Sequence, residues 1–595
     1  MFKFKFSYVM LAAALSSSFV YADPTTYTHS SGTKVIDIEK PNAAGVSHNM
    51  YRDFNVDSKG LILNNSANDL NHDSLGNIAK NNNLTDGNAS VILNEVISNK
   101  SSALNGFIEV AGQKADVIIA NPNGISCSGC SFINTNKAVL TTGKVNLNDS
   151  GEISSYTVTG GELTIGQNGM DATNSYAVLL ADAIAINGTI NAKNAIVGGG
   201  NFTFDNSTGA MTSAGKSATV MQTLFPEYSV DISNLGGIKA NSISMIGNNL
   251  GFGVRNKGAI VANSSLAMTS NGLLTNEGSI TSNGMITQIA SAGNLKNTGN
   301  ISTKNMTLLN SLSSLTNEGA ISSTKQLLVS ASGNIENAGT IKSETTLNVT
   351  TAGNLKTTYG SNLLSDNQLV VTALGNIDNG GSTRGKNTMM TFGGNSLKVT
   401  GNIYGYDTLL VQAMKSNEMT SGEITNSGTM SGKNVTIQTK GTLAINAGHL
   451  LASESLTTNS YWLNNAKGNI RGNDATINLN NTVTNNTGHI IGDTLNITTK
   501  LDLLNEGLIQ SMGDLNINTQ GRGNIINRSV ISAAGTMTLD ATRVINGGYS
   551  CGWFYLNTCG KGTLRANKLI LNSTHQYANN MGGNQYFKVT EVNTK

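Results

Sequence analysis

The feature that most constrains the fold of this chain is a repeat of about 20 residues in its second half. The segments RNKGAI, TNEGSI, KNTGNI, TNEGAI and ENAGTI align, and the steps between their glycines are 20, 21, 20 and 20 residues. A fixed period of this length, with short strand-like runs and no helical stretch, is typical of a parallel β-solenoid in which each repeat is one coil. After one longer step of 27 residues between Gly401 and Gly428, the series continues to residue 548. Its members are Gly258, Gly278, Gly299, Gly319, Gly339, Gly360, Gly381, Gly401, Gly428, Gly448, Gly468, Gly488, Gly507, Ser529 and Gly548.

Each repeat combines a turn with a strand-like run. The turn carries Asn-x-Gly, and because both residues tolerate positive φ, we expect left-handed backbone there. The Ile or Val two or three residues after the glycine is expected to face inward and to stack on its equivalents. Runs such as MTLLN, QLLVS and TLNVT supply the strands. At about 4.8 Å per coil, some fourteen coils predict a rod of roughly 70 Å.

Composition excludes several other classes of protein. The 595 residues are 12% charged with a formal net charge of +2, which is unsuited to the clustered positive charge that nucleic-acid binding needs. A β-sandwich would show turn signals every 8 to 12 residues without a fixed long period. A disordered chain would not keep inward Ile and Val residues in register.

The N-terminus has the features of a secretory signal peptide. Lys3 and Lys5 precede an apolar stretch, which ends at the small-residue pattern before Ala22. The apolar stretch is too short and too rich in serine for a membrane anchor. We therefore expect cleavage between Ala22 and Asp23 and export of the mature chain from the cytoplasm.

Four cysteines form two local pairs, Cys127 with Cys130 and Cys551 with Cys559. Outside the cytoplasm such pairs favour disulfides. A zinc site would need further Cys or His ligands at similar spacing, and a redox centre would usually open a helix. The flanks ADVIIA and SFINT are strand-like instead. We expect structural disulfides, with metal binding or a reactive thiol as the alternatives.

The second cysteine pair encloses an aromatic segment that breaks the repeat. Trp553, Phe554 and Tyr555 lie within YSCGWFYLNTCGKG, residues 549–562. We interpret this segment as a hairpin-like excursion from the rod, acting either as a local cap or as a contact patch. The tail from His575 to Lys595 is expected to leave the repeat.

A different turn follows the strand-like run VIIA in the first half. Asn121, Pro122, Asn123, Gly124 and Ile125 spell NPNGI. Proline fixes one φ angle and Asn-Gly accepts positive φ at the next positions. The motif therefore either only folds a turn or also contributes to a signal that another protein reads.

Three segments of the first half together resemble a known family. GVSHNMYRDFNVDSKGLILNNS (45–66), SVILNEVIS (90–98) and the segment 115–145 that contains NPNGI resemble the secretion domain of two-partner secretion exoproteins. That family includes filamentous haemagglutinins, hemolysins and contact-dependent inhibition proteins. The resemblance implies a right-handed parallel β-helix with an N-terminal cap. It also implies export through an outer-membrane transporter that carries POTRA domains.

One motif departs from the family pattern. Where many members have NPNL, this chain has Asn81, Asn82, Asn83 and Leu84. The missing proline could loosen the turn without abolishing its function. The resulting domain prediction is a signal peptide at 1–22, a secretion domain at 23–270, a repeat rod at 271–548 and a cysteine-stapled excursion with the tail at 549–595.

The sequence predicts no enzyme, cofactor, metal site or small-molecule substrate. Its six histidines are scattered, and none of the common catalytic or nucleotide-binding motifs occurs. His449 and His489 share a repeat position two coils apart and are expected to face solvent. The predicted function is a secreted or surface-displayed haemagglutinin-like adhesin of a Gram-negative bacterium, reaching the outside through the periplasm and binding a receptor on host or bacterial cells.

The alternative is a hemolysin or the stalk of a contact-dependent growth-inhibition toxin. Toxic members of the family carry their effector in a long C-terminal part, and no distinct C-terminal domain is recognisable before Lys595. On this alternative the chain would be a truncated stalk that lacks its effector.

Overall fold

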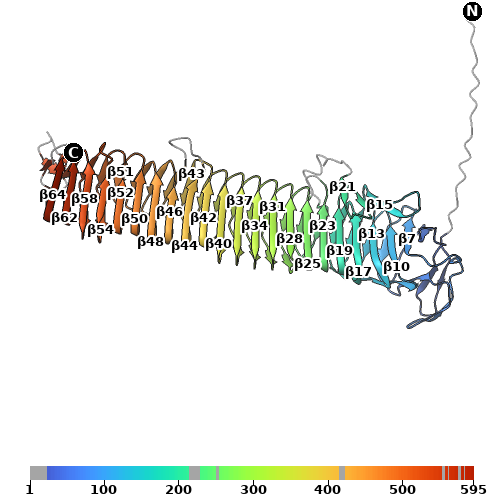
Figure 1. The fold of residues 1–595 in the computed structure, drawn as a ribbon. Helices are drawn as coiled ribbons and strands as arrows, with labels where there is room; N and C mark the ends of the chain where they lie inside the picture. The colour runs from blue at the N-terminus through green and yellow to red at the C-terminus, as the bar shows by residue number, and fades with distance from the viewer. Residues whose placement is uncertain are drawn as a thin grey trace, which may run out of the picture.

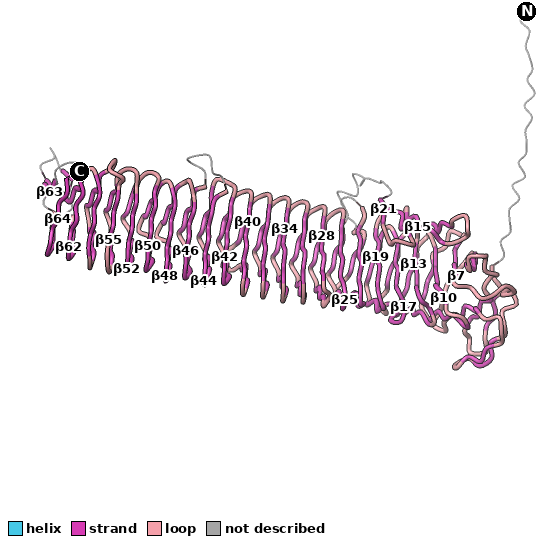
Figure 2. Tube along the Cα trace, viewed as in Figure 1, coloured by secondary structure: helices cyan, strands magenta, loops and turns pink. Residues whose placement is uncertain are grey.

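The described residues wind into one long rod, with the first and the last of them at opposite ends (Figure 1). A computed structural model describes residues 23–213, 228–249, 253–414, 422–547, 549–551, 557–559, 562–573, 578–581 and 583–594. Strands, turns and loops make up all of these residues (Figure 2), and none of them belongs to a helix that could cross a membrane. The rod has about 22 turns of roughly 21 residues. At about 4.8 Å per turn it is roughly 105 Å long. The predicted right-handed parallel β-helix is confirmed.

Each coil has three faces. In one coil of the rod, β26 (Leu274–Asn276) lies on the third face, β27 (Ser279–Ser282) on the first and β28 (Ile286–Ser291) on the second. Each strand pairs in parallel with its equivalent one coil later, in register. The first and second faces belong to one sheet that bends between them, and the third face is a separate sheet.

The third face runs almost the full length of the rod. Its strands are β8 (Ser102–Leu104), β11 (Ile125–Cys127), β16 (Glu162–Ile165), β18 (Ala183–Ile186), β22 (Val230–Ile232), β24 (Val254–Asn256), β26, β29 (Leu295–Asn297), β32 (Leu315–Asn317), β35 (Ile335–Asn337), β38 (Leu355–Thr357), β41 (Ile377–Asn379), β43 (Ser396–Val399), β45 (Glu423–Asn426), β47 (Thr442–Ile445), β49 (Trp462–Asn465), β51 (Val483–Asn486), β53 (Leu503–Asn505), β56 (Asn524–Asn527), β59 (Arg543–Gly547) and β63 (Ala578–Met581).

In many coils one continuous strand bends over the first and second faces. These strands are β17 (Met170–Ala181), β19 (Thr189–Gly199), β23 (Gly237–Gly247), β25 (Ala259–Ser270), β42 (Ser382–Phe392), β44 (Asn402–Ala413), β46 (Thr429–Gln438), β48 (His449–Ser460), β50 (Asn469–Leu479), β52 (His489–Thr498), β62 (Thr563–Ser573) and β64 (Asn584–Thr594).

In other coils two shorter strands cover the same two faces. Besides β27 and β28, these are β30 (Asn300–Thr303), β31 (Met306–Ser311), β33 (Ala320–Ser323), β34 (Gln326–Ala331), β36 (Thr340–Ser343), β37 (Thr346–Thr351), β39 (Asn362–Ser365), β40 (Gln368–Ala373), β54 (Leu508–Ser511), β55 (Leu515–Asn518), β57 (Val530–Ala533) and β58 (Thr536–Ala541).

The N-terminal end is less regular and is capped. β1 (Thr26–Thr28) pairs antiparallel with β2 (Lys34–Asp37), covering the edge of the first parallel strand. Such a cap blocks the open edge that would otherwise template pairing with another chain. The remaining strands of this end are β3 (Val46–Tyr51), β4 (Leu61–Asn65), β5 (Leu70–His72), β6 (Gly76–Ile78), β7 (Val91–Val96), β9 (Phe107–Gly112), β10 (Ala115–Ala120), β12 (Cys130–Ile133), β13 (Thr135–Thr141), β14 (Lys144–Leu147), β15 (Ile153–Val158), β20 (Phe202–Asp205) and β21 (Met211–Ser213).

The core is a stack of identical or similar apolar side chains. Ile280, Ile301, Ile321 and Ile341 follow their turn glycines by two residues, and each is fully buried. Alternate residues of the same strands point outward and are half-buried or exposed. The inward position expected from the repeat is therefore confirmed, and burial of these rows supplies the main apolar stabilisation.

The expected left-handed backbone is found at Gly360, with φ of +82°, but not at four successive turn glycines before it. Gly278, Gly299, Gly319 and Gly339 do not adopt left-handed φ. A Cβ atom on Gly299 would instead lie 2.0 Å from the carbonyl oxygen of Gly278, and the same clash recurs at the next two coils. Glycine is required here because successive turns stack with their backbones in close approach.

The asparagine of the same turn has an interior role. The Nδ2 of Asn276 donates to Oδ1 of Asn297 at 2.7 Å, and Asn297 and Asn317 continue the series at 2.8 Å each. These side chains are fully buried. A second run of the ladder joins Asn465, Asn486, Asn505, Asn527 and Asn546. Within each run the amides pair with one another, although the buried Oδ1 of Asn465, at the start of the second run, has no partner among the described residues.

The sequence predicted two departures from the repeat near the C-terminus, the cysteine-enclosed segment 549–562 and the tail 575–595. β60 (Tyr549–Cys551) and β61 (Asn557–Cys559) pair antiparallel as a separate two-stranded sheet. Trp553, Phe554 and Tyr555 lie outside the described residues. The tail does not leave the repeat, because β64 pairs with β62 in parallel register from Asn584 to Thr594. Main-chain hydrogen bonding to the exposed edge of β62 holds this last coil although its sequence matches the repeat poorly.

Candidate functional site

The NPNGI motif forms a turn that is tied to the preceding coil. Asn121 is fully buried at the end of β10, and its Nδ2 donates to the carbonyl of Lys100 at 2.9 Å and to Oγ of Ser102 at 3.0 Å. Its Oδ1 accepts the backbone N–H of Asn123 at 3.0 Å. The N–H of Gly124 closes the turn on the carbonyl of Asn121 at 3.1 Å. The turn is therefore fixed from inside the rod.

Its outer surface is formed by the two residues between these anchors. Pro122 and Asn123 are exposed, and Nδ2 of Asn123 donates to the carbonyl of Ser98 at 2.7 Å. Gly124 adopts φ of +110°, as the sequence predicted, whereas Asn123 does not have positive φ. The turn presents a rigid Pro-Asn pair to solvent.

The Asn81–Leu84 segment folds into the same turn without proline. Nδ2 of Asn81 donates to the carbonyls of Ile38 at 2.9 Å and Asn64 at 3.0 Å, while its Oδ1 accepts the N–H of Asn83 at 2.9 Å. The N–H of Leu84 closes the turn on the carbonyl of Asn81 at 3.3 Å.

The positions of the two turns correspond one to one. Asn81 is buried like Asn121, and Asn82 is exposed at the place of Pro122. Both turns share the buried first asparagine, but Leu84, at the place of Gly124, does not adopt left-handed φ, and the expected loosening of this turn stays a prediction.

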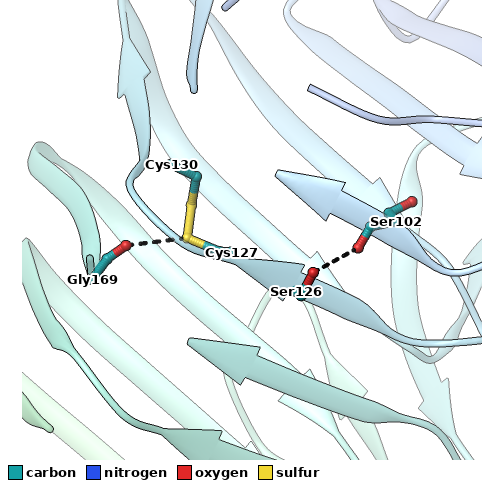
Figure 3. The surroundings of a disulfide bond; sticks show 5 residues. All are labelled: Ser102, Ser126, Cys127, Cys130 and Gly169. Atoms are coloured by element: carbon teal, nitrogen blue, oxygen red, sulfur yellow. Dashed lines mark hydrogen bonds between the residues drawn. A yellow bond between two sulfur atoms is a disulfide. The ribbon is translucent and has the colours of Figure 1, made fainter. Parts of the chain in front are cut away.

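Cys127 and Cys130 form a disulfide at the corner that follows the NPNGI turn (Figure 3). Both cysteines are buried, and their Cα atoms are 5.4 Å apart. In the sheet, Cys127 stands in register with Leu104 and Ile165, so the bridge occupies apolar core positions. The N–H of Gly129, which has φ of +84°, donates to the carbonyl of Gly169 at 2.8 Å. The pair closes a corner between the third and first faces.

A small sheet outside the rod was not anticipated from the sequence. β14, β15, β20 and β21 pair antiparallel over residues 144–213 and pack against the rod through a separate apolar cluster. Tyr156 of β15 and Phe202 of β20 are fully buried in this cluster. Two sequence features could have indicated its strands, namely the alternation of apolar and polar residues in ISSYTV and the FTF run.

A cleft of about 320 Å³ lies between this sheet and the rod. Asp116 and Lys137 line it with their charged groups 3.8 Å apart, and Lys137 Nζ donates to Oδ1 of Asn206 at 3.2 Å. Burial raises the pKa of the Asp116 carboxyl, an effect that the Lys137 ammonium opposes. Burial also raises the pKa of Tyr156 above its ordinary value.

The histidines do not converge on a site. His48 pairs with Glu95 at 2.7 Å and His72 with Glu109 at 3.0 Å, on separate strands. His449 and His489 are exposed two coils apart, as expected. Among the described residues, no group of three or more His, Cys, Asp or Glu side chains is placed to hold a metal ion.

Three predicted features fall wholly or partly outside the described residues. Residues 1–22, which include the signal peptide and Ala22, lie outside them, and the description begins at Asp23. The backbone of Cys551 and Cys559 is described in β60 and β61, but their side chains are not, so their disulfide stays a prediction. Part of the longer repeat between Gly401 and Gly428, residues 415–421, is likewise not described.

Two family descriptions match this chain over most of its length. The TPS (two-partner secretion) secretion domain matches residues 16–282, which contain both turns, the disulfide and the outer sheet. The haemagglutinin repeat matches residues 301–358, 358–431 and 472–576 of the rod. The chain belongs to the two-partner secretion exoproteins. Exoproteins of this family cross the outer membrane of Gram-negative bacteria with the help of an outer-membrane transporter partner.

Curated relatives are similar to the N-terminal part of this exoprotein. The chain is 41% identical over 253 residues to Toxin CdiA of Yersinia pestis, and 39% identical over 245 residues to the tRNA nuclease CdiA of Yersinia mollaretii. It is 40% identical over 246 residues to the 16S rRNA endonuclease CdiA of Enterobacter cloacae. These matches cover 40–42% of this chain but only 7–8% of the relatives.

Among solved structures, the filamentous hemagglutinin secretion domain is 30% identical to this exoprotein. That match covers 48% of this chain and 95% of the other, with a TM-score of 0.39. The HMW1 secretion domain from Haemophilus influenzae is 14% identical, with a TM-score of 0.25, and the match covers 74% of this chain and 98% of the other.

Proposed function

We propose that this exoprotein is a filamentous-haemagglutinin-like adhesin displayed on or released from a Gram-negative cell. The observation that carries the proposal is the rod itself, whose interior is filled by stacked apolar and amide side chains. A filled rod offers its outer faces for binding rather than an enclosed reaction site. Its long, regular sides suit contact with a receptor on a host or bacterial cell.

Export is proposed to depend on the two buried-asparagine turns. Residues 121–125 and 81–84 would form part of the signal that a transporter with POTRA domains reads. Both turns are fixed by interior hydrogen bonds and present exposed residues to solvent. A transporter could therefore recognise their shape and not only their sequence.

The domain division extends this proposal. Residues 1–22 would be removed, 23–270 would carry the secretion domain, 271–548 would form the repeat rod, and 549–595 would hold a cysteine-stapled excursion and the C-terminal tail. The irregular N-terminal end and the repeating rod differ in structure in a way that supports separate roles.

A second candidate is the stalk of a contact-dependent growth-inhibition toxin. Identity of 39–41% to proteins named as CdiA toxins and nucleases favours it. That identity covers the secretion domain alone, so it supports shared export more directly than shared toxicity.

One experiment separates the candidates. The full chain is expressed with its transporter in a non-adherent, non-toxic strain, and adherence, growth of co-cultured bacteria and lysis of red cells are measured. The adhesin proposal expects adherence that depends on the transporter, without lysis or growth inhibition. Lysis, or inhibition of neighbouring cells without any gain in adherence, would contradict it.

A further inference from the structure

One outward-facing row on the first face carries an unusual set of side chains. Arg384 of β42 is in register with Tyr404 of β44, and the row continues through Ser431 and Leu451 to Arg471 of β50. We call this series, from Arg384 to Tyr586, the outer row. The strands that carry it lie side by side along one flank of the rod (Figure 1). Neighbouring members are about 4.8 Å apart.

Arginines are concentrated in this row. Of the eight arginines in the sequence, Arg384, Arg471 and Arg565 all belong to it. All three are exposed, and within the described residues they form no ion pair. By contrast, the two arginines of the chain that do form ion pairs there, Arg255 and Arg528, lie elsewhere. The three guanidinium groups are thus available to an external anion.

Tyrosines accompany the arginines. Tyr404 follows Arg384 by one coil, and Tyr586 follows Arg565 by one coil. Tyr404 is half-buried and Tyr586 is 57% exposed, while Tyr406, two residues from Tyr404 but outside the row, is 58% exposed. The Arg–Tyr combination therefore occurs twice on the same row, eight coils apart along the register.

Each tyrosine of the row lines a groove at the bend between the first and second faces, and Arg384 does not line the first of these grooves. The first groove, of about 640 Å³, is lined by Tyr404, Tyr406, Lys433 and Arg471 among others. The second, of about 1190 Å³, includes Arg565 and Tyr586.

Lysines beside the first groove add little net charge to it. Lys386 and Lys433 are paired with Asp407 at 3.5 Å and Glu454 at 3.0 Å. The arginines are consequently the unneutralised positive groups of the outer row.

This chemistry fits an acidic polysaccharide. Guanidinium groups bind carboxylate or sulfate through paired hydrogen bonds, and exposed tyrosines offer flat apolar faces with a polar tip against which sugar rings pack. Successive arginines of the row stand four coils apart, about 19 Å, so only an extended ligand such as a polymer can reach two of them at once. A partner protein would be expected to need a larger apolar patch than two separated tyrosine sites.

We propose that the outer row binds an acidic polysaccharide lengthwise, with Arg384, Arg471 and Arg565 on its anionic groups and the tyrosines against its rings. The inference deepens the proposed adhesin function by naming a ligand class, and it rests on that function. It concerns the purified, exported rod, so binding can be measured without cells.

The test uses the full exported chain and defined polymers. Binding to polygalacturonate, dextran sulfate, neutral dextran and polyglutamate is measured by surface plasmon resonance at two salt concentrations. The variant Arg384→Gln/Arg471→Gln is compared with the matched control Lys356→Gln/Lys398→Gln, which removes the same charge from the third face. A third variant, Tyr404→Ser/Tyr406→Ser, tests the rings. All substituted side chains are half-buried or exposed, so unchanged circular dichroism is required of each variant.

We expect the arginine variant to lose at least tenfold in affinity for an acidic polysaccharide, while the lysine control stays within twofold. The tyrosine variant should lose affinity for the polysaccharide but not for polyglutamate. Equal binding of polyglutamate by the unmodified chain, equal losses in the lysine control, or no polysaccharide binding at all would overturn the inference. If adherence to cells persists while polysaccharide binding is absent, this inference fails and the adhesin proposal stands.

Discussion

The N-terminal end and the rod achieve the same coil by different means. Among the described residues, thirteen of the sixteen glycines with left-handed φ lie before residue 210, and three lie after it. In the N-terminal end, individual turns depend on such glycines and on single buried side chains such as Asn121. In the rod, turns such as those at Gly278 and Gly299 repeat one geometry in which backbones stack closely. The N-terminal end therefore has individually specified turns, whereas the rod repeats one coil along its axis.

This difference has a consequence for function. An individually specified turn can be recognised as a distinct surface, as a secretion signal requires. A coil that repeats its neighbours can be added or removed with little effect on them, because each coil contacts mainly the adjacent ones. Substitutions in the two regions should therefore differ in their effect on the free energy of unfolding.

The largest effect is expected from Asn121→Ala in the N-terminal end. The change leaves the part-buried carbonyl of Lys100 and the buried hydroxyl of Ser102 without their donor, and it removes the acceptor for the N–H of Asn123. At about 1–3 kcal/mol for each unsatisfied buried group, we expect a loss of about 4 kcal/mol. Denaturant unfolding of a secreted fragment containing residues 23–300 measures it, and Asn123→Ala should cost much less because its side chain is exposed.

The next effect is expected from Gly299→Ala in the rod. The added Cβ would overlap the carbonyl oxygen of Gly278, so two coils must separate at an expected cost of about 3 kcal/mol. Gly209→Ala is the matched control in the N-terminal end, because there only the left-handed φ opposes alanine and nothing lies within 4 Å. The control should cost about 1 kcal/mol. Equal losses at both sites would contradict the two separate reasons for glycine.

Interrupting the asparagine ladder should have a moderate effect. Asn317→Ala removes the partner of both Asn297 and Asn337, for an expected loss of about 2 kcal/mol. Hydrogen exchange of residues 290–345 should report faster opening of the neighbouring coils. The effect should fade within a few coils, since Val399 and Ile445 already interrupt the third-face position naturally. Unfolding of the whole rod by this substitution would argue against coil-by-coil stability.

Reducing the first disulfide should have a smaller effect. The bridge closes a loop of only four residues, and loop-closure entropy for so short a loop is worth at most about 2 kcal/mol. Cys127→Ala/Cys130→Ala should therefore lower the unfolding midpoint slightly and leave the fold intact. Loss of export without loss of folding would instead give the bridge a role in recognition.

The smallest effect is expected from Asn82→Pro, which restores the proline of the family pattern. The position corresponds to Pro122 in the equivalent turn and is exposed. A compatible proline stabilises by about 0.4–1 kcal/mol because it restricts the unfolded chain. A measurable destabilisation would show that the two turns are not equivalent.

The sequence predicted the repeat far better than the irregular end. The inward Ile positions, the strands and the solenoid follow from period and alternation, because a repeated environment selects the same residue in every coil. The role of the turn asparagine and glycine was misjudged, since close stacking and a buried ladder exist only once coils pack. The outer sheet, the cleft at Asp116 and the anchors of Asn121 depend on contacts between distant segments, which no local pattern reveals. The return of β64 to the rod was missed because main-chain pairing with an open edge leaves little trace in the sequence.

The most direct test of the account is export of paired variants. The full chain carrying Asn121→Ala/Asn123→Ala, or Asn317→Ala as the rod control, is expressed with and without the transporter, and the protein in the culture medium is quantified. The account predicts that unmodified chain and rod control reach the medium only with the transporter, while the turn variant remains in the periplasm. Equal export of the turn variant and the rod control would contradict the claim that the individually specified N-terminal turns carry the secretion signal.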